Sequence, residues 1–266
     1  MPTALVLPAA GSGTRLGAGL PKAFVPLAGR PLLAHAVAGA VRSGVIDAIV
    51  IAAPAALLED AQRIAQAAAE APVGSSAGPP GPGPGGDPVP ISVVAGGADR
   101  TVSVAAALAA VPHADRVLVH DAARCLTPAA VYRRVVAALE QGAAAVVPVL
   151  PVTDTVKTAT DAGTVVGDLD RAALRRVQTP QGFVRDVLVA AHDLHRAEPD
   201  PAATDDAGLV ERLDVAVVGV AGDEAALKIT HPIDLRIAEL HLDDARGTDP
   251  QTTTARAPGD ARRSPA

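Results

Sequence analysis

Short apolar runs alternate with segments of helical spacing along most of the chain. The first run, residues 4–7, leads directly into Pro-Ala-Ala-Gly-Ser-Gly, which is typical of a buried parallel strand that ends in a glycine-rich turn. Similar runs rich in valine, isoleucine and alanine predict strands at 46–52, 91–95, 117–120, 143–149 and 215–220. Apolar positions three and four residues apart predict helices at 31–41, 56–69, 103–110, 129–139, 186–195 and 232–242.

This alternation predicts an α/β fold with a Rossmann-like, mostly parallel sheet and helices on both faces. We expect one domain over residues 1–242. Within it, glycine, proline and serine crowd residues 72–90, which favours a disordered insertion. Residues 150–178 are rich in threonine, aspartate and glycine with short β-like pieces, so we expect a protruding β-arm for dimerisation. The polar tail, 243–266, is expected to be disordered.

Composition and charge exclude several classes of function. The chain has 266 residues and a net charge of −6, without a basic block or aromatic clusters, so it lacks the features of a general nucleic-acid binder. No apolar run reaches the roughly 18 residues that span a bilayer, and no charged segment precedes the first apolar run. We therefore expect a soluble, cytoplasmic protein without a membrane partner. A single cysteine, Cys125, excludes an intrachain disulfide framework and a cysteine-rich zinc site.

The glycine-rich turn after the first strand is a candidate anion site. Gly11 and Gly13 place side-chain-free amides close together, where they can surround a phosphate. The spacing fits neither the dinucleotide fingerprint, since Leu16 stands where a third glycine is needed, nor a Walker loop. Such a turn is also what a simple strand–helix junction requires. The nearby Arg15 and Lys22 favour the anion site, because a guanidinium fork and a compact ammonium both suit phosphate oxygens.

Taken in order, the motifs resemble one family of enzymes. The run Leu-Pro-Ala-Ala-Gly-Ser-Gly-Thr-Arg-Leu-Gly at 7–17, followed by Pro-Lys at 21–22, is similar to the opening of the sugar-phosphate nucleotidyltransferases. Further motifs narrow the resemblance to the 2-C-methyl-D-erythritol 4-phosphate cytidylyltransferase family; they lie at 96–103, 119–124, 154–157, 170–171, 179–181, 204–206 and 227–232. The resemblance covers about residues 4–242, except 72–90.

The resemblance implies an enzyme that transfers CMP from CTP to 2-C-methyl-D-erythritol 4-phosphate and releases pyrophosphate, with Mg²⁺ on the triphosphate. The product, 4-diphosphocytidyl-2-C-methyl-D-erythritol, belongs to the non-mevalonate route to isoprenoid precursors. Such a reaction depends on positioning and charge more than on a covalent nucleophile. Two alternatives stay open: a ribitol-5-phosphate cytidylyltransferase, which shares the glycine loop and both early cations, and a noncatalytic nucleotide-binding module.

The resemblance also implies roles for individual residues. The implied catalytic residues are Arg15, Lys22, Arg171 and Lys228. The implied substrate-binding residues are Ala9, Ala10, Gly11, Gly13, Gly96, Gly97, Ser103, Asp121, Ala122, Arg124, Thr155, Thr204 and Asp205. Asp121 is in addition a candidate metal ligand, with Mg²⁺ held mainly by the triphosphate. Because Thr155 and Arg171 fall in the expected arm, they are expected to reach the site of a neighbouring subunit, which implies a homodimer with arm exchange.

Some of these residues also have a plain structural explanation. Lys228 is consistent with a solvated charge at a strand end, and Asp121 with the cap of a turn. Thr204 and Asp205 are equally consistent with the cap of a short helix. Two positions depart from the family: Ala98 stands where an acidic residue is common, and Ala226 where asparagine is usual.

Overall fold

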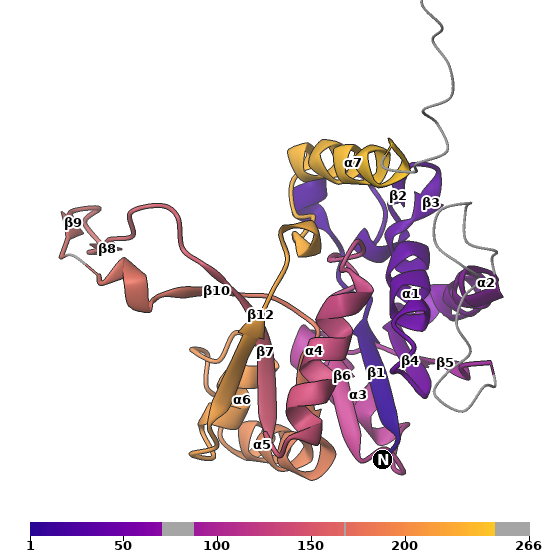
Figure 1. Ribbon diagram of the computed structural model, residues 1–266, viewed down its shortest axis with the longest axis horizontal. Coiled ribbons are helices and arrows are strands. Elements are labelled where there is room, and N and C mark those ends of the chain that lie inside the picture. The colour runs from indigo at the N-terminus through magenta and orange to yellow at the C-terminus, as the bar shows by residue number, and fades with distance from the viewer. Residues whose placement is uncertain (71–87, 168, 248–266) are drawn as a thin grey trace, which may run out of the picture.

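The computed structural model describes residues 1–70, 88–167 and 169–247. Its centre is one mixed sheet with the strand order β10-β7-β11-β6-β1-β4-β5, and β12 also pairs with β7 (Figure 1). Four of its strands are β1 (Thr3–Pro8), β4 (Ala48–Ala53), β5 (Ile91–Ala95) and β6 (Arg116–Val119). These four are parallel to one another. The predicted α/β fold with a mostly parallel sheet is therefore confirmed.

The other half of the sheet is mixed. Here β11 (Gln181–Val184) lies antiparallel between β6 and β7 (Ala145–Pro151), and β10 (Arg175–Val177) runs antiparallel to the end of β7. The last strand, β12 (Val217–Ala221), is parallel to β7. β11 was not predicted from the sequence. It has only four residues and contains a glycine, so its place inside the sheet comes from pairing on both sides and not from a local pattern.

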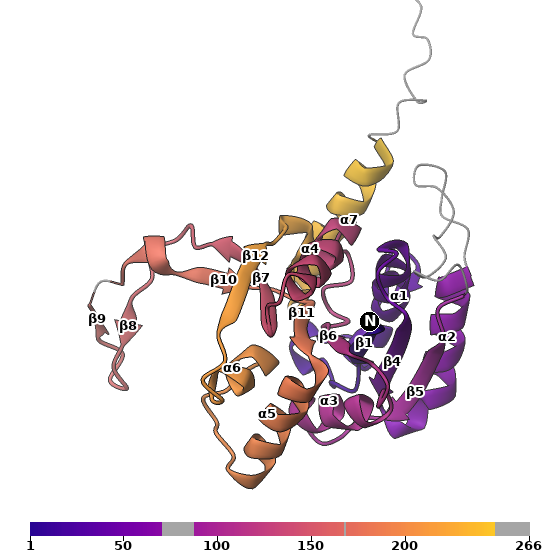
Figure 2. The same cartoon turned by 60° about the horizontal axis from the view of Figure 1, so that its bottom comes forward.

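Helices cover both faces of the sheet, as predicted (Figure 2). One face carries α1 (Leu32–Arg42), α2 (Leu58–Glu70) and α4 (Ala129–Glu140), and the other carries α3 (Arg100–Ala109), α5 (Arg185–Ala197) and α6 (Asp206–Glu211). The alternation of side chains along β1 explains this arrangement. Leu5 and Leu7 pack into the core beneath α1, α2 and α4, whereas Ala4 and Val6 pack into the core beneath α3, α5 and α6. Because both faces are buried, the strand is apolar without interruption.

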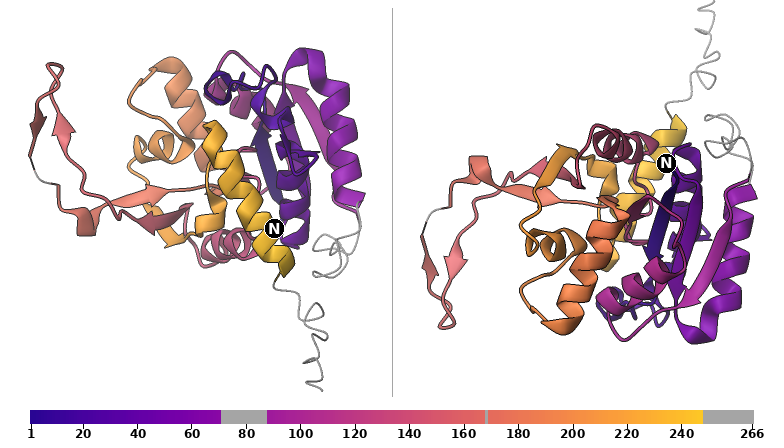
Figure 3. Two further views of the ribbon diagram at one scale, coloured as in Figure 1. Left: turned by 90° about the horizontal axis from the view of Figure 1, so that it is seen from above. Right: turned by 90° about the horizontal axis from the view of Figure 1, so that it is seen from below.

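The segment after β7 leaves the body of the molecule and carries a small hairpin, β8 (Thr158–Ala159) and β9 (Val165–Val166), far from the sheet (Figures 1 and 3). It then returns through the short 3-10 helix η4 (Arg171–Ala173) into β10. The protrusion agrees with the predicted arm, but its bounds are narrower than 150–178, because residues at both ends pair within the main sheet. The role of the arm in dimerisation stays a prediction.

The last helix, α7 (Pro232–Gly247), lies near the hairpin formed by β2 (Pro26–Leu27) and β3 (Arg30–Pro31). It continues past the predicted boundary at 242, so the expectation of a disordered tail from 243 is wrong for residues 243–247. Gly247 is the first helix-breaking residue after that boundary. Residues 71–87, which include 72–87 of the predicted insertion, and residues 248–266 lie outside the described residues. Among the helices that the structure describes, none is long and apolar enough to cross a membrane.

Candidate active site

A pocket of about 510 Å³ lies at the carboxyl ends of β1 and β6. The chain leaves β1 toward β4 on one side and later returns to β6 on the other, and such a switch point is where open α/β sheets bind ligands. Many of the predicted site residues line this pocket. They are Ala9, Ala10, Gly11, Gly13, Arg15, Lys22, Gly97, Ser103, Asp121, Ala122 and Lys228.

The glycine-rich loop after β1 folds back on itself and brings Lys22 against Gly13. The Lys22 amide donates to the Gly11 carbonyl oxygen at 3.1 Å. Gly13 has a φ of +69°, and a Cβ at this position would lie 2.8 Å from the Lys22 Cβ. Gly13 is therefore required both by its left-handed backbone and by the close approach of Lys22. The 3-10 helices η1 (Thr14–Leu16) and η2 (Lys22–Phe24) then hold Arg15 and Lys22 at the pocket.

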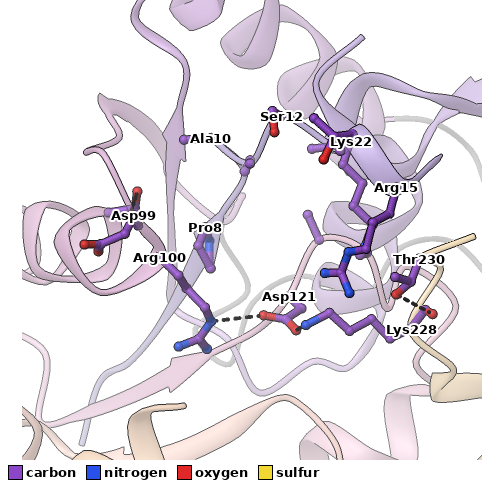
Figure 4. Close-up of a pocket in the computed structure, with 18 of the residues that line it drawn as sticks. Pro8, Ala10, Ser12, Arg15, Lys22, Asp99, Arg100, Asp121, Lys228 and Thr230 are labelled. Atoms are coloured by element: carbon purple, nitrogen blue, oxygen red, sulfur yellow. Dashed lines mark hydrogen bonds and ion pairs between the residues drawn. The ribbon is translucent and has the colours of Figure 1, made fainter. Parts of the chain in front are cut away.

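Cations from two distant segments meet in the pocket (Figure 4). Arg15 and Lys22 come from the glycine-rich loop, and Lys228 comes from the segment between η5 (Glu224–Ala226) and α7. Burial, followed by the repulsion of Lys228, lowers the pKa of Lys22 to about 8. Lys22 is thus still mostly protonated at neutral pH. The pocket offers concentrated positive charge, which suits a polyanionic ligand.

Asp121 lies at the centre of this charge, directly after β6 and its neighbour His120. Its Oδ2 is 2.7 Å from Lys228 Nζ, and its Oδ1 is 3.3 Å from Arg100 Nε. Burial by itself raises the pKa of Asp121, but Arg100 and then Lys228 outweigh it and hold that pKa well below its usual range. The backbone amide of Asp121 donates to Thr179 Oγ1 at 3.0 Å. The carboxylate is therefore ionised and fixed from several sides.

The segment that carries Lys228 is anchored through its backbone. The Ile229 amide donates to the carbonyl oxygen of Ala123 at 2.9 Å. Two residues before Lys228, Ala226 is fully buried, and its carbonyl oxygen accepts from Arg124 Nη1 at 2.8 Å. Although Ala226 departs from the family pattern, its backbone carbonyl still anchors the segment that carries Lys228.

The second glycine turn lies against the first. A Cβ on Gly96 would lie 2.5 Å from the Ala10 Cβ, so glycine allows the two turns to touch. Ser103 Oγ accepts from the Gly97 amide at 3.0 Å and donates to the Asp99 carbonyl oxygen at 2.7 Å. The Ser103 hydroxyl thus holds the turn in shape. Gly96 itself does not line the pocket, which makes it a packing residue in this structure.

Comparison with known proteins identifies the family. The family model described as 2-C-methyl-D-erythritol 4-phosphate cytidylyltransferase matches residues 3–244. The chain belongs to this family. It is therefore a nucleotidyltransferase, as the motifs predicted.

Curated relatives and solved structures of cytidylyltransferases agree over nearly the whole chain. A 2-C-methyl-D-erythritol 4-phosphate cytidylyltransferase of Nocardia farcinica is 50% identical over 90% of this chain and 93% of its own length. The enzyme of that name from Saccharopolyspora erythraea is 49% identical over 91% of this chain and 100% of its own length. The crystal structure of 2-C-methyl-D-erythritol 4-phosphate cytidylyltransferase from Thermus thermophilus has 36% identity and a TM-score of 0.67, and the match covers 92% of this chain and 100% of that one. These similarities support the predicted cytidylyltransferase function.

Three substrate-binding residues predicted from the cytidylyltransferase motifs lie outside the pocket, with their polar groups engaged elsewhere or in solvent. Arg124 donates to Ala226 and, at 3.3 Å, to the Val177 carbonyl oxygen. Asp205 caps α6 by accepting from the Gly208 amide at 2.9 Å, which is the structural explanation that the sequence left open. Thr204 is exposed beside it. Within this chain the structure does not bring these residues to the pocket.

The two arm residues of the predicted cytidylyltransferase site are also remote from this pocket. Thr155 and Arg171 are both exposed, and Arg171 Nη1 donates to the Thr153 carbonyl oxygen at 2.7 Å. The arm projects away from the body that contains the pocket (Figure 1). Neither residue contributes to the pocket of its own chain.

Arg100 is among the pocket residues that were not predicted from the sequence. Arg100 lies within the motif at 96–103 and begins α3, but no role was assigned to it. It lines the pocket and forms ion pairs with Asp121 and, at 2.6 Å, with Asp206. The only local signal was an arginine three residues after the Gly96-Gly97 pair. Its two partners come from distant parts of the chain, so no sequence spacing reveals them.

Proposed function

We propose that this protein transfers CMP from CTP to 2-C-methyl-D-erythritol 4-phosphate, giving 4-diphosphocytidyl-2-C-methyl-D-erythritol and pyrophosphate in isoprenoid precursor synthesis. The convergence of Arg15, Lys22 and Lys228 on one glycine-lined pocket carries this proposal. Membership of the cytidylyltransferase family supports it. CTP is a cytoplasmic metabolite, so we also propose a cytoplasmic enzyme.

In this proposal the cytosine lies against the small residues of the two glycine turns. Ala9, Ala10, Gly11 and Gly97 line the pocket, and their small or absent side chains leave room for a base to approach the backbone. None of the described residues that line it is aromatic, and Tyr132 is fully buried elsewhere. The base is therefore recognised at its edge by backbone groups, without stacking on a ring.

The triphosphate lies among the three cations. Arg15 can bind two phosphate oxygens with one guanidinium, whereas the ammonium groups of Lys22 and Lys228 can follow oxygens whose charge changes during the reaction. The attacking sugar phosphate is already anionic at neutral pH, so the reaction needs no general base. The protein contributes by aligning two anions that repel each other and by stabilising the charge that develops at the α-phosphate.

The residues fit a Mg²⁺ ion that is carried mainly by the triphosphate. In residues 1–70, 88–167 and 169–247 no three His, Cys, Asp or Glu side chains form a group able to hold a metal ion. Asp121 is the carboxylate at the centre of the pocket, and magnesium commonly uses one or two carboxylates together with substrate phosphates. We propose Asp121 as its protein ligand. When bound, the ion neutralises part of the triphosphate charge.

The acceptor site is proposed to be completed by a second subunit. Arg171 and Thr155 extend from the body on the arm, where they are exposed and available to another copy of the chain. Arg124, at the base of the arm, adds a further cation on the side of β10. A homodimer with arm exchange would place these groups on the phosphate and hydroxyls of the polyol.

A substrate panel tests the proposed function. Purified protein is incubated with Mg²⁺, CTP and either 2-C-methyl-D-erythritol 4-phosphate or ribitol 5-phosphate, and pyrophosphate and the diphosphocytidyl product are measured. We expect turnover with the methylerythritol phosphate and little with ribitol 5-phosphate. Turnover with ribitol 5-phosphate alone supports the second candidate, which shares the same loop and cations. CTP binding without any turnover supports a noncatalytic nucleotide-binding module.

A further inference from the structure

Arg100 joins two carboxylates that belong to different parts of the fold. It is the first residue of α3, and its Nε lies 3.3 Å from Oδ1 of Asp121 at the end of β6. Its Nη1 lies 2.6 Å from Oδ2 of Asp206, the first residue of α6. One guanidinium therefore links the pocket to a helix that does not line it. Figure 4 shows the contact between Arg100 and Asp121 at the edge of the pocket.

Asp206 is a fixed anchor. It is fully buried, and Nε2 of the buried His192 on α5 lies 3.0 Å from its Oδ1. The next residue of α6, Ala207, donates its amide to Oε1 of the buried Gln181 at 3.2 Å. The start of α6 is thus bound to both α5 and β11, and Asp206 cannot move without repacking. A buried carboxylate in this position requires a charged partner, which Arg100 provides.

Asp121, by contrast, shares its carboxylate between two cations. Arg100 holds Oδ1, so Oδ2 faces Lys228 Nζ at 2.7 Å. A guanidinium is planar and rigid, so fixing one of its edges on Asp206 also fixes the direction of the other edge. The orientation of Asp121, and with it the position of Lys228, therefore depends on the contact between Arg100 and Asp206.

We propose that Arg100 and Asp206 are positioning residues of the nucleotide pocket. Asp206 anchors Arg100, Arg100 orients the Asp121 carboxylate, and Asp121 holds Lys228 where it meets the triphosphate. If Arg100 only neutralised the buried Asp206, it would not also need to line the pocket and contact Asp121. The kinetic part of the test rests on the proposed function, whereas its structural part does not.

The kinetic test is a double-mutant cycle that uses Arg100→Lys and Asp121→Asn. Lysine keeps the charge beside Asp206, but one ammonium cannot span both carboxylates. We expect Arg100→Lys to lower kcat/KM at least tenfold in the wild-type background and less than about twofold in the Asp121→Asn background, because the effect passes through Asp121. Equal losses in both backgrounds would show a role independent of Asp121 and overturn the proposal.

A matched control separates positioning from general damage. Arg185 begins α5 as Arg100 begins α3, and it is part-buried but remote from the pocket. Arg185→Lys is therefore expected to keep wild-type kcat/KM and the wild-type melting temperature within a few degrees. Asp206→Asn should show the same dependence on Asp121 as Arg100→Lys. If Asp206→Asn does not fold, Arg100→Lys decides the matter alone.

The structural test does not require turnover. In a crystal structure of the Arg100→Lys variant, we expect the Asp121 carboxylate to rotate and its 2.7 Å contact with Lys228 to be lost. An unchanged Asp121 and Lys228 overturns the proposal, whatever the kinetics. If the wild-type protein fails to turn over CTP with either polyol phosphate, the proposed function fails, and this crystal structure still decides the positioning role.

Discussion

Lys228 and Asp121 form an ion pair in the pocket, with Nζ 2.7 Å from Oδ2. The two residues come from distant parts of the chain: Asp121 follows β6, and Lys228 precedes α7. This contact holds Lys228 in the pocket, where it is the third cation beside Arg15 and Lys22 of the glycine-rich loop. In the proposed complex the triphosphate shares Lys228 with Asp121, and the carboxylate then determines where the ammonium is held.

Replacing Lys22 with alanine is expected to lower kcat at least about 10²-fold, or about 3 kcal/mol, because the variant loses one preorganised charge that faces the transition state. Melting temperature should change little, since burial and neighbouring cations already disfavour the charged form of Lys22, as its pKa of about 8 indicates. Arg63→Ala, which removes an exposed cation on α2, is the control and should leave kcat unchanged. A kcat near that of the wild type in Lys22→Ala would remove this residue from the mechanism.

The pKa of Lys22 also predicts a pH dependence. Burial and then Lys228 lower this pKa to about 8, so Lys22 is protonated below that pH and loses its charge above it. We expect kcat/KM for CTP, which reports groups of the free enzyme, to fall as the pH rises through about 8. Lys22→Arg should lack this step, since arginine stays charged. The same decline in both proteins would assign the titration to a different group.

Substitutions at two glycines distinguish the effect of backbone strain from the effect of displacing Lys22. Gly13 and Gly17 have nearly the same φ, +69° and +67°, but only at Gly13 would a Cβ meet Lys22. Substitution by alanine at either position should cost about 1 kcal/mol of stability from the left-handed backbone. Only Gly13→Ala is expected to raise KM for CTP and lower kcat, since it pushes the loop away from Lys22. Equal kinetic losses in the two variants would contradict this explanation, and steady-state kinetics with thermal unfolding measures both effects.

Arm exchange predicts that two inactive variants complement each other. Lys22→Ala removes a pocket residue, and Arg171→Ala removes an arm residue that does not line the pocket of its own chain. After the two proteins are unfolded together and refolded in equal amounts, we expect about a quarter of wild-type activity, because half of the dimers then carry one complete site. Each variant refolded alone is the control. Failure to recover activity in dimers proven to be mixed would place Arg171 and Lys22 in the same chain's site.

The alternation of apolar runs and helical spacing was sufficient to predict the main strands and helices. The strand at 91–95 and the start of the helix at Ala129 were placed correctly. The strand packs on both of its faces and leaves a run of apolar residues, whereas the helix packs on one face and leaves apolar residues three and four positions apart. β11 was missed because a four-residue segment becomes a strand only through its pairing with β6 and β7. The continuation of α7 to Gly247 was missed because its polar residues do not show the apolar spacing of the preceding turns.

The site residues also divide into those that a local motif reveals and those that only the folded chain brings together. The residues with local motifs, such as Lys22 beside the glycine turn, were found from the sequence, and the fold then brought Lys228 to them. The role of Arg100 could not be predicted, since it depends on carboxylates at Asp121 and Asp206 that meet only in three dimensions. For Asp205 the sequence left a cap and a ligand equally open, and the hydrogen bond to Gly208 shows the cap.

A crystal structure with CTP and Mg²⁺ would show whether one nucleotide occupies the proposed pocket. We expect cytosine against the turns at Gly11 and Gly97, with Arg15, Lys22 and Lys228 all in contact with one triphosphate. A triphosphate that lies outside the reach of these three cations, or a base bound away from the two glycine turns, would contradict the proposed function of the pocket.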